Sequence, residues 1–148
     1  MANRELSKAE WLDKAEAYCA RAEHCAADVR RKLYEWGAPA DLYDEIEENL
    51  YKNDFLNDAR FCHAYAHDKV AYQSWGRQKI QAGLRALQLS ERAISTAMDE
   101  IDEEQYCKNL ENLYLQRRAD SEEKRLRFLI QRGFVYEEIK KVAKNLHK

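Results

Sequence analysis

The side chains best suited to bind a metal ion are two histidines and a cysteine near the middle of the chain. His63 and His67 are four residues apart, so on a helix they share one face, and Cys62 is adjacent to His63. A zinc site needs at least three such ligands, and the sequence contains neither a Glu-x-x-His nor a His-Glu-x-x-His pattern. We interpret these residues as ordinary polar or partly buried side chains and predict no metal and no cofactor.

A second candidate is a reactive thiol at Cys25, which follows His24 and stands at a predicted helix start. A helix start can lower the pKa of a thiol and so favour the nucleophilic thiolate. However, no third residue is marked that would orient such a pair. No Gly-rich phosphate loop is present either, because Gly76 and Gly83 are seven residues apart in a helical pattern. The sequence therefore predicts no catalytic residue, and we do not expect an enzyme.

Basic side chains are better candidates for function, because they cluster in two places. Such clusters serve phosphates or an acidic protein face equally well, and the alternative interpretation of each residue is a solvated helix face. The candidate contacts are Lys69, Arg77, Lys79, Arg85, Arg117, Arg118, Lys124, Arg125, Arg127, Arg132, Lys140, Lys141 and Lys144.

The aromatic residues are mostly predicted to belong to the core rather than to stack on nucleotide bases. Trp11, Trp36, Tyr43 and Tyr51 fall at helical spacing. Trp75 differs, because it precedes a glycine and has polar and basic neighbours, so a core role and a contact role both stay open.

Composition indicates one folded, cytoplasmic protein rather than a membrane or secreted one. The 148 residues are 45% hydrophobic and 35% charged, no run is long enough to span a membrane, and the N-terminus is too polar for a signal peptide. The four scattered cysteines are predicted to be free thiols. Residues 1–55 carry 8 basic and 13 acidic side chains, whereas residues 103–148 carry 11 and 8. This asymmetry could orient the protein on a charged partner.

Apolar spacing predicts an all-α fold of about nine helices. Ser7-x-x-Glu10 and Asp120-x-x-Glu123 are predicted capping boxes, and Ser90 is a predicted N-cap. The predicted helices beyond the first include 26–36, 58–70, 75–87, 91–101 and 103–119.

An internal repeat groups these helices in threes. Leu33 precedes Gly37 by four residues, as Leu84 precedes Gln88 and Leu129 precedes Gly133. We therefore predict three tandem three-helix repeats, which would form an elongated, curved protein. A single nine-helix globule is the alternative. The predicted repeats cover residues 1–55, 56–102 and 103–148.

Four motifs in this order resemble the RecX family, whose members regulate the bacterial recombinase RecA. They are the segment from Arg21 to Leu33, similar to R-x-E-x-S-x-x-E-L-x-x-K-L; Asn53 to Phe61 with Tyr65; Trp75 to Ile80; and Leu126 with Arg-Gly-Phe134 and Ile139. Three positions depart from the family pattern. Cys25 replaces an N-cap Ser or Thr, Asp28 replaces Glu, and Gln88 replaces a Gly, so we expect the helix before Gln88 to end differently.

The resemblance implies a monomeric regulator that lies in the groove of the RecA–DNA filament. There it would inhibit ATP turnover and strand exchange, and so modulate homologous recombination and DNA repair. Its partners would be RecA and possibly single- or double-stranded DNA directly, with no membrane. Two alternatives stay open, a sequence-nonspecific DNA-binding helical repeat protein and a helical scaffold for another protein.

Overall fold

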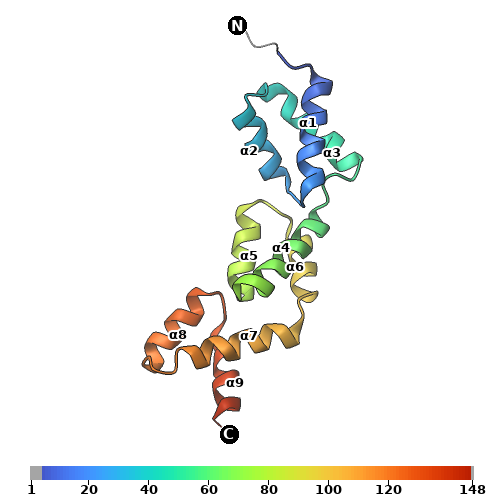
Figure 1. The fold of residues 1–148 in the computed structure, drawn as a ribbon. Coiled ribbons are helices and arrows are strands. Elements are labelled where there is room, and N and C mark those ends of the chain that lie inside the picture. The colour runs from blue at the N-terminus through green and yellow to red at the C-terminus, as the bar shows by residue number, and fades with distance from the viewer. Residues whose placement is uncertain (1–4, 148) are drawn as a thin grey trace. The chain divides into compact units, whose positions relative to one another are not determined.

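The protein is all-helical in the computed structural model, which describes residues 5–147 (Figure 1). Within that range it has nine α-helices, one short 3-10 helix and no strand, so the predicted all-α, repeat-like fold is confirmed. The helices are α1 (Lys8–Arg21), α2 (Ala26–Trp36), η1 (Ala40–Leu42), α3 (Tyr43–Lys52), α4 (Asp58–Gln73), α5 (Arg77–Ala86), α6 (Glu91–Asp99), α7 (Glu103–Gln116), α8 (Glu122–Gln131) and α9 (Tyr136–Leu146).

The chain forms two compact units that divide between Phe61 and Cys62, inside α4. In the first unit, α1, α2 and α3 all pack against one another (Figure 1). Their shared core includes Trp11, Leu33 and Leu50. In the second unit, α5 packs on α6, and α7 packs on both α8 and α9.

Local side-chain hydrogen bonds fix several helix starts. The predicted capping box at Ser7 is confirmed, because its hydroxyl accepts from the Glu10 N–H at 3.2 Å and the Glu10 carboxylate accepts from the Ser7 N–H. The predicted box at Asp120 is wrong by one residue. Ser121 caps α8 by accepting from the Lys124 N–H, while the Asp120 N–H donates to the Arg117 carbonyl within the preceding turn.

The expectation that Gln88 ends its helix differently is also wrong. Its φ is +65°, in the same left-handed region as Gly37 (+81°) and Gly133 (+105°). At each position the next residue is buried and donates its N–H back into the helix. The three bonds are Ala38 to Leu33 (2.9 Å), Leu89 to Leu84 (3.2 Å) and Phe134 to Leu129 (3.1 Å). Burial and hydrogen bonding after the turn therefore outweigh the strain that a side chain brings to it.

We expect Gln88→Gly to stabilise the protein. Glycine removes a backbone strain of ~1–2 kcal/mol from the folded state. Because glycine also gives the unfolded chain more conformational freedom, the net gain in the free energy of unfolding is about 0.5–1 kcal/mol. Urea unfolding of the purified variant measures the change. Gln81→Gly, in the middle of α5, is the matched control and should cost about 1 kcal/mol. A loss of stability at Gln88 would contradict the inferred strain.

Candidate interaction surface

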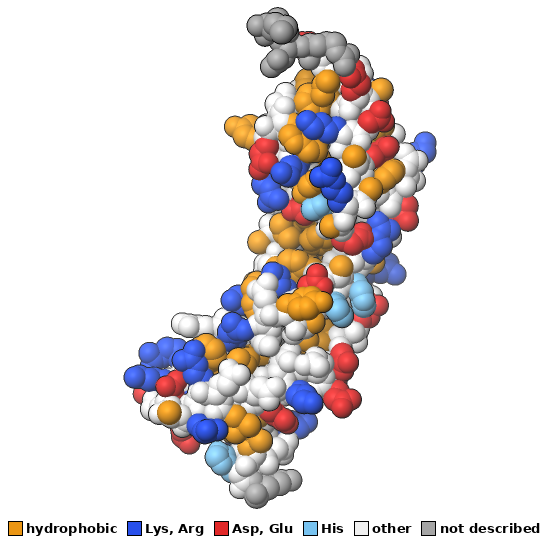
Figure 2. Space-filling model, in the orientation of Figure 1, with side chains coloured by type: hydrophobic (Ala, Val, Ile, Leu, Met, Phe, Trp, Pro, Cys, Tyr) orange, Lys and Arg blue, Asp and Glu red, His pale blue; other side chains and the backbone are white. Residues whose placement is uncertain are grey.

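All thirteen predicted basic contacts lie in the second unit. Figure 2 shows Lys and Arg side chains gathered over this unit, most densely at α8. Lys69 is on α4; Arg77, Lys79 and Arg85 are on α5; Arg117 and Arg118 follow α7; Lys124, Arg125 and Arg127 are on α8, which Arg132 follows; and Lys140, Lys141 and Lys144 are on α9.

Four of these cations are engaged by carboxylates. Arg77 pairs with Glu103 and Glu138, Arg85 with Glu91, Arg117 with Asp120, and Arg127 with Glu123. Within residues 5–147 the other nine form no ion pair, which leaves their charge available to an external anion. They are Lys69, Lys79, Arg118, Lys124, Arg125, Arg132, Lys140, Lys141 and Lys144.

Two of the available cations are held against the ring of Trp75. The ammonium nitrogens of Lys69 and Lys79 lie 4.5 and 4.4 Å from its centroid, and the Tyr65 ring meets it edge-on at 6.5 Å. Trp75 is only partly buried, so it serves the packing and also positions two charges. Tyr72, three residues beyond Lys69 on α4, is 79% exposed. This basic-aromatic cluster consists of Tyr65, Lys69, Tyr72, Trp75 and Lys79.

Arginines of the third predicted repeat also lie on aromatic rings. The guanidinium of Arg117 is 3.8 Å from the Phe128 centroid, and that of Arg125 is 4.3 Å from the Tyr114 centroid. The Nε atoms of Arg125 and Arg132 are buried without a hydrogen-bond partner, while the Arg132 guanidinium donates to the Gln73 carbonyl. Stacking and backbone contacts thus order Arg125 and Arg132, whereas Arg117 is also paired with Asp120.

A close contact between two glycines joins the α4–α5 connection to the α8–α9 connection. The Gly76 N–H donates to the Arg132 carbonyl at 2.8 Å, and the Gln78 N–H donates to the Gly133 carbonyl at 3.0 Å. A Cβ at Gly76 would lie well inside van der Waals contact with the Gly133 backbone, and one at Gly133 would lie 2.6 Å from the Lys79 Cβ. This glycine joint brings the cluster at Lys79 next to Arg132.

Two side chains of α7 complete the joint. The buried Tyr106 hydroxyl accepts from the Arg77 N–H at 3.0 Å and donates to Glu138 at 3.2 Å. Burial raises the pKa of Tyr106, which keeps this donor protonated. Asn109, also buried, donates to the Val70 carbonyl at 2.8 Å. Sequence reasoning missed both residues, although a polar Asn three residues after Tyr106 on an apolar helix face was a usable signal.

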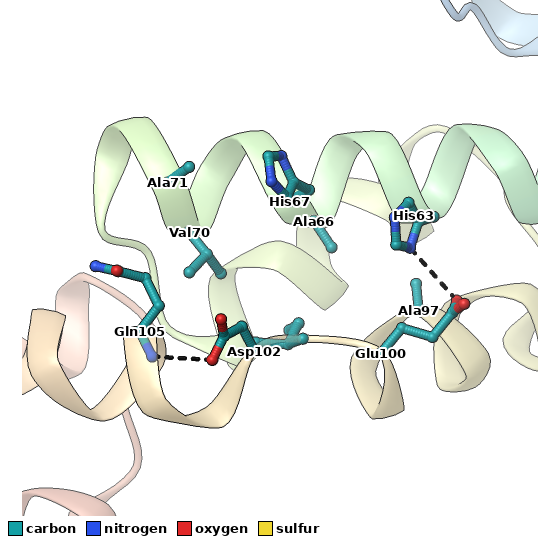
Figure 3. Close-up of a pocket in the computed structure, with 10 residues that line it drawn as sticks. His63, Ala66, His67, Val70, Ala71, Ala97, Glu100, Asp102 and Gln105 are labelled. Carbon is teal, nitrogen blue, oxygen red and sulfur yellow. Dashed lines mark hydrogen bonds and ion pairs between the residues drawn. The ribbon is translucent and has the colours of Figure 1, made fainter.

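The two central histidines lie on one face of α4, as predicted, and both are exposed. His63 Nδ1 is 3.6 Å from a carboxylate oxygen of Glu100, and both histidines line a hollow of about 370 Å³ (Figure 3). Cys62 is fully buried beside them. In the part of the chain that the structure describes, no three His, Cys, Asp or Glu side chains are grouped to hold a metal ion.

The structure also places Cys25 and Tyr51. Burial raises the pKa of the Cys25 thiol, which is opposite to the lowering that a reactive thiol at a helix start needs. Cys25 is 2% exposed, and Asp28 caps its backbone N–H at 3.4 Å instead. Tyr51 is 39% exposed rather than a core residue, because its hydroxyl reaches Asp58 at 2.7 Å.

The fold and this surface define a class, an all-helical, repeat-like protein with ordered cations on its second unit. No helix among residues 5–147 has the length and hydropathy needed to cross a bilayer. Residues 57–98 match the family description "RecX, second three-helix domain". A regulatory protein RecX from Pelodictyon phaeoclathratiforme is 30% identical over 128 residues, which cover 83% of this chain and 80% of the relative. The chain therefore belongs to the RecX family of regulatory proteins.

Other similar proteins agree. A regulatory protein RecX from Cronobacter sakazakii is 27% identical, with 90% of each chain covered. A crystal structure of RecX from Lactobacillus salivarius has a TM-score of 0.79 at 18% identity and covers 95% of this chain and 96% of that one. A crystal structure of a regulatory protein RecX has a TM-score of 0.77 at 20% identity, covering 97% and 81%. At these identities the two structures support the fold.

Proposed function

We propose that this chain binds the RecA–DNA filament and inhibits its ATPase, recombinase and strand-exchange activities. The observation that carries the proposal is the match to regulatory proteins named RecX over most of both chains. We further propose a cytoplasmic, monomeric regulator without catalytic activity of its own, built from repeats at residues 1–55, 56–102 and 103–148.

The available cations of the second unit are the proposed contacts. A filament of protein on DNA presents phosphates and carboxylates, and both attract ammonium and guanidinium groups. Lys69, Lys79 and Arg125 are the strongest candidates, because aromatic rings hold them in place without an acidic partner. Ordering a long side chain in advance reduces the entropy lost on binding.

The test is the single-strand-DNA-dependent ATPase of RecA, titrated with this protein from far below to above the concentration of RecA. We expect inhibition well below a one-to-one ratio, because one regulator that blocks filament growth affects many RecA subunits. No inhibition at excess would reject the proposal and leave a helical scaffold for another partner. Inhibition only near saturation of the DNA, lost as salt rises, would indicate competition for the strand instead.

Direct DNA binding is the second candidate, favoured by the basic-aromatic cluster around Trp75. Two cations lie on the ring of Trp75, and the exposed Tyr72 is on the same helix as Lys69, so the cluster offers both phosphate contacts and the aromatic surface that single-strand binding uses. Fluorescence anisotropy with a labelled oligonucleotide and no RecA tests this role. Steeply salt-dependent binding would support it, and no binding at low salt would exclude it.

A further inference from the structure

A hollow lies between α4 and the α6–α7 connection, and none of the thirteen basic candidates is among its described lining residues. Its floor is made of small or short apolar side chains, because Ala66, Val70 and Ala97 are all buried and leave room above them. The resulting space of about 370 Å³ is large enough for one or two side chains of a partner. Figure 3 shows His63 and Glu100 at one end of the hollow and Asp102 and Gln105 at the other.

The mouth of the hollow is acidic. Glu100 and Asp102 line it, and none of the described residues that line it is Lys or Arg. Asp102 already accepts from the Gln105 N–H at 3.2 Å, and Glu100 faces His63. Both acidic side chains are exposed and retain oxygens for a further donor. An apolar floor beneath an acidic mouth complements a cation on an aliphatic stem.

We propose that this hollow is a docking site for a cationic segment of a partner protein, in which Arg or Lys alternates with an aliphatic side chain. The aliphatic side chain enters above Ala66 and Ala97, and the cation binds the carboxylates of Glu100 and Asp102. An acidic ligand would be repelled from this mouth. The site goes beyond the proposed filament contacts, because it selects the opposite charge and uses none of the thirteen basic residues.

The test is a titration of the full isotope-labelled chain with a six-residue peptide of alternating Arg and Leu, followed by amide NMR shifts. We expect saturable shifts centred on the residues that line the hollow, and none with the same peptide carrying Glu in place of Arg. Glu100→Lys should raise the dissociation constant on the order of tenfold, because the cation of the peptide loses a hydrogen bond to a charged group. Asp99→Lys is the matched control, because its equal charge change lies outside the lining.

A second pair of variants tests the shape of the site. Ala71→Trp should fill the hollow from its exposed edge and abolish the shifts, whereas Ala82→Trp, at an exposed position on α5, should leave them unchanged.

Equal weakening of peptide binding by Glu100→Lys and Asp99→Lys would show that the attraction is nonspecific and would overturn the proposal. So would equal binding of the Glu peptide, or no binding by either peptide at millimolar concentration. Shifts at the hollow that grow with protein concentration alone would assign it to a second copy of this chain. The spectrum of each variant also verifies its fold, and none of these results depends on RecA.

Discussion

Gly76→Ala is expected to destabilise the second unit by about 3 kcal/mol, the upper range for forcing extra atoms into a packed site. The added methyl group would overlap the backbone of Gly133, and a backbone cannot rotate away as a flexible side chain can. The hydrogen bonds from Gly76 to Arg132 and from Gln78 to Gly133 would be strained together. Urea unfolding monitored by the indole N–H signal of Trp75 measures the effect, because Trp75 is the tryptophan of this unit.

Gly37→Ala is the control that separates steric overlap from backbone strain. Gly37 has a left-handed φ of +81°, but nothing lies within 4 Å of a Cβ built there, so alanine should cost only about 1 kcal/mol. Gly76 has no positive φ, so its loss would arise from the overlap alone. A cost at Gly76 no larger than that at Gly37 would show that the joint yields easily and is not a fixed contact.

Lys69→Gln combined with Lys79→Gln is expected to weaken RecA inhibition at least tenfold, measured as the concentration that halves ATPase activity. Each lysine lacks an acidic partner within residues 5–147, so neutralising it removes charge from the proposed interface without stranding a carboxylate. If the cluster also contacts single-stranded DNA directly, the log–log slope of affinity against salt should fall by about 0.7 for each lost phosphate contact.

Arg92→Gln combined with Lys108→Gln is the matched control for that double variant. These two exposed cations belong to the same unit and are outside the thirteen candidates, so the net charge changes equally. Equal loss of inhibition in both double variants would attribute the effect to net charge. Unchanged inhibition in the Lys69 and Lys79 variant would exclude the basic-aromatic cluster as the contact surface.

The glycine joint and the cluster are connected, because Gly133 lies against Lys79 and the Arg132 guanidinium reaches the Gln73 carbonyl. The joint fixes where cations from α4 and α5 stand relative to Arg132 at the end of α8. Gly76→Ala should therefore reduce RecA inhibition even in the absence of urea, where the second unit stays folded.

The all-α fold and the family could be predicted from the sequence, because both depend on local patterns. Apolar spacing along a helix and the Ser7–Glu10 cap involve residues within four positions of each other. Two predictions about helix ends were wrong. Asp120 and Ser121 are adjacent residues that both cap helices well, and the structure uses Ser121. The turn at Gln88 depends on the burial of Leu89, which the local sequence does not reveal.

The tertiary structure alone decided which candidates belong together. Arg85 and Lys79 are both basic residues of α5. In the structure Arg85 pairs with Glu91, whereas Lys79 lies on the ring of Trp75 without an acidic partner among the described residues. The contact of Gly76 with Gly133 joins segments far apart in the sequence. The hollow beneath His63 exists because small side chains of two helices face each other. Charge pairing, close approach and empty volume depend on distances between distant segments, and helical periodicity carries no information about those distances.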